Sequence, residues 1–321
     1  MAVYTDIAED ELRAFLADYD VGELLSYKGI AEGVENSNFL LHTSSGSYIL
    51  TLYESRVNAD DLPFFIGLMD HLAGTDVTAP RPLQTKSGSS LGHLAGRPAA
   101  IVTFLEGMWP RRVKPHHCHE VGATLAKLHR ATQDFTMTRP NGLTVGDWRP
   151  ISDASASRAD SVVPGLKTEM ATSLARLEAR WPTDLPTGTI HADLFPDNVF
   201  FLGEEMAGLI DFYFACTDLL AYDLAICLNA WCFETDHMFN VTKARALFEG
   251  YQSVRALEPS EVAALPLLAQ GAAMRFLVTR LNDWLNVPPG ALVVPKDPRE
   301  YVVKLRFHSV IDHPSAYGLD L

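Results

Sequence analysis

The chain has 321 residues, and 47% of them are hydrophobic, enough to bury the core of one domain or of two closely packed ones. A formal net charge of −14 argues against a nucleic-acid partner, because phosphate contacts need Lys and Arg, and it suits a cationic or zwitterionic small molecule. The chain shows no ~20-residue apolar span, no signal-peptide pattern and no CxxC spacing among its four cysteines, so we predict a cytoplasmic protein without a membrane partner.

The first third of the chain is predicted to be rich in strands. Thr5 or Asp6 could cap a first helix, whose apolar face carries Leu12, Phe15 and Leu16. Short β-leaning runs follow, separated by small and polar residues, with one apolar helix among them. The expected strands are 24–30, 37–42, 47–53, 79–83 and 97–107, and the expected helix is 60–72.

The rest of the chain is predicted to be mostly helical. In the histidine-rich stretch 114–119, His116 and His119 would lie one helical turn apart. No acidic or thiol ligand is spaced to complete a tetrahedral zinc site there, so a solvated helix start is the simpler interpretation. Residues 139–150 are rich in Gly, Pro and polar residues and are expected to form a surface loop. Further helices are expected over 161–181, from 219, and over 241–251, 260–284 and 298–307. This pattern predicts an α+β protein.

The stretch around residue 193 gathers polar residues beside two short strands. The apolar runs 199–202 and 207–210 flank an acidic turn, which is the pattern of a β-hairpin. Asp193 and Asn198 precede the first run and Asp211 follows the second, so a hairpin would bring them together with His191. Carboxylate and amide oxygens are ligands that Mg²⁺ takes, and one carboxylate could act as a base. Asp and Asn are also common in ordinary turns, but their order beside two strands favours a site.

These residues carry a specific resemblance. His191-x-Asp193-x4-Asn198, followed by Asp211-Phe212, resembles the catalytic loop and metal-binding Asp of the protein-kinase-like phosphotransferases, in the branch with aminoglycoside phosphotransferases and choline kinases. The resemblance implies a bilobal fold, with a small β-rich N-lobe over 1–106 and a larger helical C-lobe over 107–321. It implies ATP and Mg²⁺ as cofactors, with Asn198 and Asp211 holding the metal. Asp193 would accept the proton of an acceptor hydroxyl, and His191 would brace the loop.

The resemblance also implies nucleotide contacts in the N-lobe. Residues 32–36, with Gly33 and Asn36, would cover the phosphates, although a single Gly fits neither GxGxxG nor a P-loop. Kinase relatives carry a phosphate-binding Lys on the third strand, where Thr51 stands here. The connector between the lobes would turn its backbone edge toward adenine, although an ordinary strand end fits the spacing equally well. Its residues are Thr103, Phe104 and Leu105.

A second resemblance, to a smaller group of proteins, indicates which molecule accepts the phosphoryl group. Thr51-Leu52-Tyr53-Glu54, followed by 61–65, is similar to the bacterial homoserine kinases of this superfamily, in which the Lys is likewise replaced. This resemblance covers nearly the whole chain and implies phosphorylation of the L-homoserine hydroxyl to O-phospho-L-homoserine in threonine biosynthesis. A zwitterionic acceptor needs a cation for its carboxylate. Arg275 or Arg280 could supply it, unless both are surface salt-bridge partners.

Three alternatives stay open from the residues. The same fold could phosphorylate another small alcohol, such as choline, an aminoglycoside or a sugar. The missing Lys could mark a catalytically silent nucleotide-binding module. His191, Asp193, Asp197 and Asp211 could instead form a metal-dependent hydrolase site, although such sites usually recruit more than one His.

Overall fold

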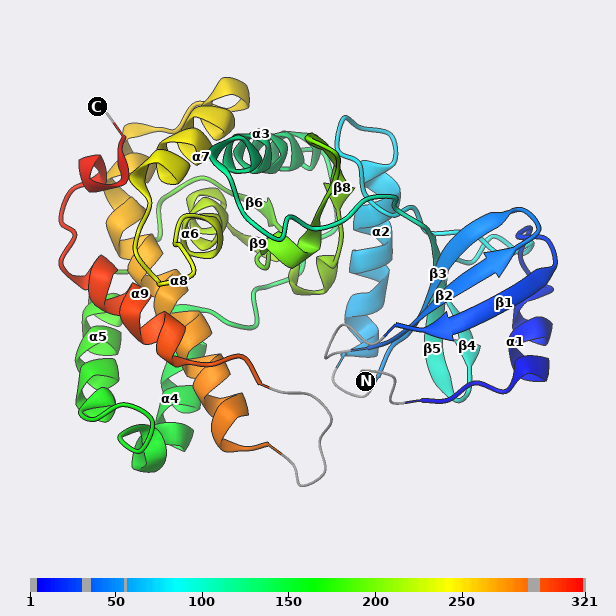
Figure 1. Cartoon of the computed structure of the whole chain (residues 1–321), viewed down its shortest axis with the longest axis horizontal. Helices are drawn as coiled ribbons and strands as arrows, with labels where there is room; N and C mark the ends of the chain where they lie inside the picture. The colour runs from blue at the N-terminus through cyan, green and yellow to red at the C-terminus, as the bar shows by residue number, and fades with distance from the viewer. Residues whose placement is uncertain (1–4, 31–35, 55–56, 288–294, 320–321) are drawn as a thin grey trace. The chain divides into compact units, whose positions relative to one another are not determined.

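The computed structural model describes residues 5–30, 36–54, 57–287 and 295–319, and the chain divides into two compact units (Figure 1). Unit 1 ends at Glu106, and unit 2 begins at Gly107. The large sheet lies in unit 1, and most helices lie in unit 2. The predicted α+β class is confirmed, with a strand-rich first part and a mostly helical second part.

Unit 1 is built on a five-stranded antiparallel sheet in the order β1-β2-β3-β5-β4. Because side chains alternate along a strand, Leu41, Leu50 and Ile101 share one face, where they form a buried core with Leu12 and Leu16 of helix α1. The three strands predicted between residues 24 and 53 are confirmed. The elements are α1 (Glu9–Leu16), β1 (Leu24–Gly29), β2 (Ser37–Thr43), β3 (Gly46–Leu52), η1 (Ala59–Asp61), α2 (Leu62–Leu72), β4 (Gly92–Leu94) and β5 (Arg97–Thr103).

The segment 79–83 corrects one strand prediction. The Leu83 N–H donates to the Ile101 carbonyl (2.8 Å), and Pro82 forms an isolated bridge with Val102, so the segment runs along β5. It does not form a continuous ladder, because Pro80 and Pro82 have no N–H group to donate. The strand that pairs with β5 at this edge of the sheet is β4, which lies outside the predicted strands.

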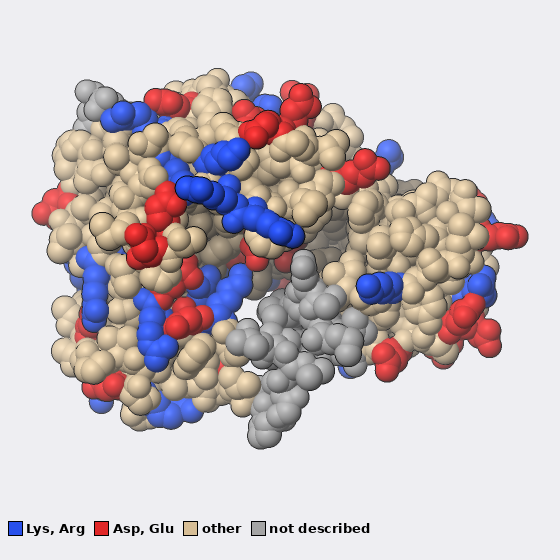
Figure 2. Space-filling view, in the orientation of Figure 1, with Lys and Arg blue, Asp and Glu red and all other residues tan. Residues whose placement is uncertain are grey.

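Unit 2 is organised around the long helix α8, against which α4, α5, α6 and α9 pack (Figure 1). α8 is long and apolar enough to cross a membrane by length and composition, but 78% of its most apolar stretch is buried inside the protein, as in the central helix of a globular core. Acidic and basic side chains are mixed over the face of unit 2 seen in Figure 2. The helices are α3 (Pro115–Ala131), α4 (Val145–Ala159), α5 (Leu166–Arg180), α6 (Leu220–Trp231), α7 (Val241–Val254), α8 (Pro259–Leu285), α9 (Arg299–Ser309) and η4 (Pro314–Tyr317).

Helix α4 replaces part of the surface loop predicted over 139–150. Thr144 opens it with a capping box, in which its hydroxyl and backbone N–H both donate to the Asp147 carboxylate (2.5 and 2.8 Å). Pro150 lies inside the helix, where its missing N–H removes one hydrogen bond. Trp148 is fully buried against Trp181, with ring centroids 5.2 Å apart, and this burial stabilises the helix despite the proline.

Helices α3 and α7 cross at two glycines. A Cβ atom on Gly122 would stand 2.0 Å from the Leu247 carbonyl oxygen, and one on Gly250 would stand 2.0 Å from the His119 carbonyl oxygen. Cβ atoms do not approach oxygen atoms this closely. The absence of a side chain at both positions therefore allows the two helix backbones to touch.

We expect Gly250→Ala to lower the free energy of unfolding by about 3 kcal/mol, because the added methyl group forces the two backbones apart. Urea unfolding measures the change. Gly146→Ala in α4 is the matched control, since a Cβ there would meet only the Thr144 hydroxyl at 3.7 Å. A Gly250→Ala protein as stable as wild type would contradict the close crossing.

A buried histidine joins α9 to α6. The Tyr317 hydroxyl donates to His308 Nδ1 (2.8 Å), and His308 Nε2 donates to Asn229 Oδ1 (3.2 Å). The Asn229 amide group donates to the Ala225 and Ala269 carbonyls (both 3.0 Å), which turns its oxygen toward the histidine. Burial, followed by the Lys304 charge, lowers the pKa of His308 to about 3. The folded protein therefore holds this ring neutral.

This histidine makes stability depend on pH. Between pH 6.5 and about 3 the unfolded chain binds a proton at His308 that the folded protein does not, so the free energy of unfolding falls as the pH drops. The contribution is about 1.4 kcal/mol per pH unit well inside this window. We expect His308→Gln to flatten the pH dependence of urea unfolding between pH 6 and 4. An unchanged slope would contradict the neutral buried ring.

Candidate active site

Two strand pairs position the candidate site in unit 2. β6 (Thr187–Ile190) pairs antiparallel with β9 (Cys216–Leu219), and the chain after β6 carries His191, Asp193 and the turn η2 (Pro196–Asn198). β7 (Val199–Leu202) and β8 (Glu205–Leu209) form the predicted hairpin. Asn198 precedes the first of these strands and Asp211 follows the second. The Ile210 N–H donates to the Asn198 carbonyl (3.0 Å), which closes the open end of the hairpin.

Asp193, Asn198 and Asp211 converge at this open end. The Asn198 amide nitrogen donates to the Asp193 carbonyl (2.8 Å) and to the Asp193 carboxylate (3.3 Å). Asp211 is near enough for its charge to act on Asp193. Its backbone adopts the left-handed conformation (φ 64°), which Asp tolerates better than most residues and which turns the chain after β8. Two carboxylates and an amide therefore share one small volume.

The electrostatics of this volume suit a divalent cation. Burial, and then the Asp211 charge, raises the pKa of Asp193 to about 8. A divalent cation beside the two carboxylates would offset their repulsion and lower the pKa of Asp193. The Asn198 amide donates through its nitrogen, so it presents its oxygen as a ligand. Carboxylate and amide oxygens are the hard donors that Mg²⁺ takes, so this donor set fits the metal.

The backbone of Ala192 is held from both sides. Ala192 has φ 62°, a left-handed conformation that costs a non-glycine residue about 1–2 kcal/mol. Its N–H donates to Asp223 Oδ1 (2.9 Å), and its carbonyl accepts from Arg275 Nη1 (2.6 Å). Both contacts are buried, so they offset the strain and fix the direction of the next residue, Asp193.

Asp223 is the buried anchor of this loop. Besides Ala192, its carboxylate accepts from the His191 N–H (2.7 Å) and from His129 Nε2 (3.2 Å). His129 Nδ1 in turn accepts from the Tyr251 hydroxyl (2.8 Å). Because Tyr251 and His129 lie on α7 and α3, the close helix crossing at the two glycines also supports the loop that carries His191 and Asp193.

His191 braces the loop against the hairpin. Its Nε2 donates to the Ile210 carbonyl (3.0 Å), and its Nδ1 accepts from the Asp193 N–H (3.3 Å). Burial lowers the pKa of the ring, which matches the neutral form that these two contacts require. The histidine therefore links the residue before Asp211 to the backbone of Asp193.

We expect Asp223→Ala to lower the free energy of unfolding by about 3 kcal/mol, because two buried N–H groups and His129 lose a charged acceptor. The kcat should also fall, since the strained Ala192 backbone loses one of its two supports. Asp223→Asn keeps one acceptor oxygen, so its free energy of unfolding and its kcat should fall less. Urea unfolding and steady-state kinetics check this order, and an Asp223→Ala protein with wild-type stability and kcat would contradict the anchoring role.

Both predicted substrate arginines are already engaged within unit 2. Arg275 is 2% exposed and bonds the Ala192 carbonyl. Arg280 is 9% exposed, pairs with Glu300 (2.7 Å) and lies 4.4 Å from the centroid of the Tyr301 ring. Neither is a surface ion-pair partner. The contacts give Arg275 a role in holding the loop and argue against a carboxylate site made by either guanidinium alone.

The predicted phosphate-side residues belong to unit 1. Gly33 lies outside the described residues. Thr51 is buried on the sheet face opposite α1, where its hydroxyl donates to Asn38 Oδ1 (2.8 Å). Asn36 is buried as well, and its side-chain oxygen accepts from the Glu54 N–H (3.3 Å). These contacts place Asn36 and Thr51 at one end of β2 and β3, and their role toward a nucleotide stays a prediction.

The predicted connector residues follow β5 at the end of unit 1. The Thr103 hydroxyl accepts from the Arg81 N–H (2.9 Å), which ties the segment 79–83 to the end of the sheet. Phe104 is 41% exposed, and Leu105 is half-buried. An exposed aromatic ring at this position is compatible with stacking on a base, and this role also stays a prediction.

The histidine-rich start of α3 meets an acidic residue from far along the chain. Glu204, in the β7–β8 turn, lies 2.5 Å from His116 Nε2, and His117 lies beside them. His117 Nδ1 accepts from the Lys114 N–H (3.0 Å), so its Nε2 carries the proton of the neutral ring and could bind a metal only as an imidazolate. Lys114 also pairs with Glu204 (3.2 Å). The protonation of His117 that the Lys114 N–H contact requires argues against a zinc site at these residues.

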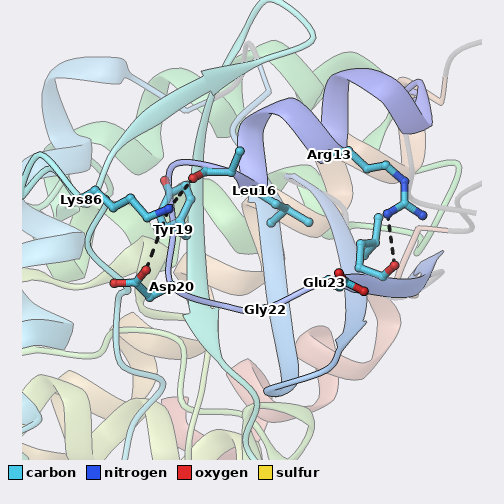
Figure 3. A pocket seen from close by; sticks show the side chains of 9 residues that line it. Arg13, Leu16, Tyr19, Asp20, Gly22, Glu23 and Lys86 are labelled. Atoms are coloured by element: carbon cyan, nitrogen blue, oxygen red, sulfur yellow. Dashed lines mark hydrogen bonds and ion pairs between the residues drawn. The ribbon is translucent and has the colours of Figure 1, made fainter.

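The pocket in Figure 3 lies beside α1 in unit 1 and has a volume of about 680 Å³. Its basic side chains are engaged, since Arg13 donates to the Leu24 carbonyl (3.2 Å) and Lys86 donates to the Ala17 carbonyl (2.8 Å). None of the predicted site residues lines it. It is a hollow between α1 and its neighbouring loops.

The fold and the site together define a class of protein. A strand-rich unit, followed by a helical unit whose loop presents one carboxylate beside an amide and a second carboxylate, is the arrangement of a kinase-like phosphotransferase. Residues 26–257 match the family described as "Phosphotransferase enzyme family". The fold is similar to that of the amicoumacin kinase hAmiN (TM-score 0.68, 14% identity, 94% of this chain and 92% of that one). It is equally similar to that of a choline kinase from Cryptosporidium parvum (TM-score 0.68, 12% identity, 94% of each chain). The predicted protein-kinase-like fold is confirmed.

Relatives with higher sequence identity indicate which branch of this family the chain belongs to. Proteins named homoserine kinase from Afipia carboxidovorans and Rhizobium meliloti are each 64% identical to this chain over 319 residues, which cover 99% of it and 98% of theirs. A protein of the same name from Rhodospirillum rubrum is 62% identical over 319 residues, 99% of each chain. The chain therefore belongs to the homoserine kinase family of these phosphotransferases.

Proposed function

We propose that the protein transfers the γ-phosphoryl group of ATP to the hydroxyl of L-homoserine and releases O-phospho-L-homoserine and ADP, a step of threonine biosynthesis in the cytoplasm. The observation that carries this proposal is the convergence of Asp193, Asn198 and Asp211 in a chain 64% identical to proteins named homoserine kinase. The related kinase hAmiN is described in complex with AMP-PNP and Ca²⁺, which supports a nucleotide and a divalent cation as cofactors.

Asp193 acts on the acceptor. Its ionised carboxylate accepts the proton of the homoserine hydroxyl and orients the oxygen in line with the phosphorus atom that it attacks. The loop that carries it is fixed beforehand by Asp223 and Arg275, through both peptide groups of Ala192. Little reorganisation is then needed when charge develops, and positioning of this kind supplies most of the catalysis in phosphoryl transfer.

Asn198 and Asp211 are the residues that would hold Mg²⁺. When bound, the metal neutralises charge on the phosphoryl oxygens. Asn198 lies just before the first strand of the hairpin and Asp211 just after the second, so both are at its open end. The backbone hydrogen bond from Ile210 to Asn198 (3.0 Å) holds the two strand ends together. His191 donates a second hydrogen bond, to the Ile210 carbonyl, which joins the catalytic loop to the hairpin.

An ATP-consumption assay over a panel of acceptors tests the proposal. With Mg²⁺ present, we expect turnover of L-homoserine to exceed that of choline, an aminoglycoside and a sugar alcohol, with the product identified by ³¹P NMR. Turnover of one of the other acceptors instead would overturn the assignment of substrate. Nucleotide binding without any turnover would indicate a silent module, and phosphate release without an acceptor would indicate a hydrolase.

A further inference from the structure

An exposed ion pair stands beside the catalytic loop. Lys296 Nζ lies 3.3 Å from Asp197 Oδ2, and the two side chains are 60% and 52% exposed. The Lys296 ammonium also lies 5.2 Å from the centroid of the Phe195 ring. Solvent reaches both charged groups and screens their attraction, so an exposed pair of this kind adds little stability. The pair can therefore open at small cost when a better partner arrives.

The pair belongs to the same turn as the proposed base. The Phe195 N–H donates to the Asp193 carbonyl (2.8 Å), and the Asn198 N–H donates to the Phe195 carbonyl (3.0 Å). Asp197 is thus carried on the short turn that joins Asp193 to Asn198. The contact between Asp197 and Lys296 Nζ (3.3 Å) therefore places the ammonium group beside this turn.

If the phosphoryl acceptor is an amino acid, its binding site needs a cation for the carboxylate and an anion for the ammonium group, both near Asp193. Arg275 is 2% exposed and donates a hydrogen bond to the Ala192 carbonyl, and Arg280 is paired with Glu300. Lys296 is the exposed cation among these, and it already has an acidic partner. A lysine and an aspartate in contact match the carboxylate and the ammonium group that a zwitterionic amino acid carries on one carbon atom.

We propose, resting on the function given above, that Lys296 and Asp197 recognise the amino-acid head of L-homoserine. Lys296 binds the α-carboxylate, Asp197 binds the α-ammonium group, and the side-chain hydroxyl extends to Asp193. The internal ion pair exchanges its two partners for the two charges of the substrate, so no charge is left unpaired. This exchange explains how an acceptor site can select a zwitterion without a buried arginine clamp.

Truncated acceptors separate the two contacts. 3-Aminopropan-1-ol lacks the carboxylate and 4-hydroxybutyrate lacks the ammonium group, so each should be insensitive to loss of the residue that binds the missing group. We expect Lys296→Met to raise the KM for L-homoserine by about 10- to 100-fold and to leave kcat/KM for 3-aminopropan-1-ol unchanged. Asp197→Asn should raise the KM for L-homoserine and leave 4-hydroxybutyrate unchanged. Where a truncated acceptor turns over slowly, its inhibition constant against L-homoserine replaces kcat/KM.

Lys86→Met is the matched control, because Lys86 is also 60% exposed and paired with an aspartate, Asp20, in unit 1. We expect Lys86→Met to leave the KM for L-homoserine and kcat/KM for 3-aminopropan-1-ol unchanged. The KM for ATP should stay within twofold of wild type in all three variants. Equal losses on L-homoserine and 3-aminopropan-1-ol in Lys296→Met, or a raised KM for ATP, would overturn the carboxylate assignment. Wild-type protein inactive on L-homoserine would overturn the proposed function itself, whereas full activity with an unchanged KM in Lys296→Met would overturn this inference alone.

Discussion

Asp193→Asn is expected to lower kcat with L-homoserine by about 10²- to 10⁴-fold, the range that a positioned general base contributes. The amide has the shape of the carboxylate, and its oxygen can still accept from the Asn198 side chain, so the loop should keep its geometry. It cannot accept the proton of the acceptor hydroxyl. Steady-state kinetics measure the loss, and calorimetric titration with AMP-PNP and Mg²⁺ should show nucleotide binding close to that of wild type.

The outcome separates two roles for this residue. A kcat within about twofold of wild type would remove Asp193 as the base. A large loss of nucleotide binding would instead assign it to the metal. Asp236→Asn is a suitable control, because Asp236 is an acidic residue of a surface turn, where its side chain accepts from the Met238 N–H (3.0 Å).

Asp211→Asn is expected to lower kcat/KM by about 10³-fold, because the site loses the charged ligand that neutralises the metal and its phosphates. The left-handed backbone at residue 211 suits Asn as well as Asp, so the fold should be preserved. The loss should be smaller with Mn²⁺ than with Mg²⁺, since Mn²⁺ accepts neutral ligands more readily. Kinetics across a series of metal concentrations measure this effect. Equal apparent metal affinity in the variant and wild type would exclude Asp211 as a ligand.

The predicted hairpin, and the proximity of the polar residues beside it, depend on residues that are local in sequence. The hairpin follows from two apolar runs around an acidic turn, and once it forms, Asn198 and Asp211 are brought to its open end whatever the rest of the fold does. The order of His191, Asp193 and Asn198 carries the resemblance because these residues share one loop. The strands β1, β2 and β3 were likewise predicted from short β-leaning runs separated by small and polar residues.

The parts that were missed depend on contacts between distant residues. Nothing near Arg275 indicates that its guanidinium meets the Ala192 carbonyl, 83 positions away, so a substrate role was the natural prediction. Lys296 and Asp197 are 99 positions apart, and their pairing requires α9 to be packed in place. Helix α4 begins at the Thr144–Asp147 capping box, whereas the prediction of a surface loop over 139–150 followed from its Gly, Pro and polar residues. That box was visible in the sequence.

We propose that one hairpin supplies the metal ligands while the neighbouring loop supplies the base. Electron paramagnetic resonance of Mn²⁺, titrated into the protein with AMP-PNP, tests it most directly by comparing wild type, Asp193→Asn and Asp211→Asn. We expect Asp193→Asn to bind Mn²⁺ about as tightly as wild type and Asp211→Asn to bind it at least tenfold more weakly, a difference of about 1.4 kcal/mol. Wild-type affinity in Asp211→Asn, or an equal loss in both variants, would contradict it.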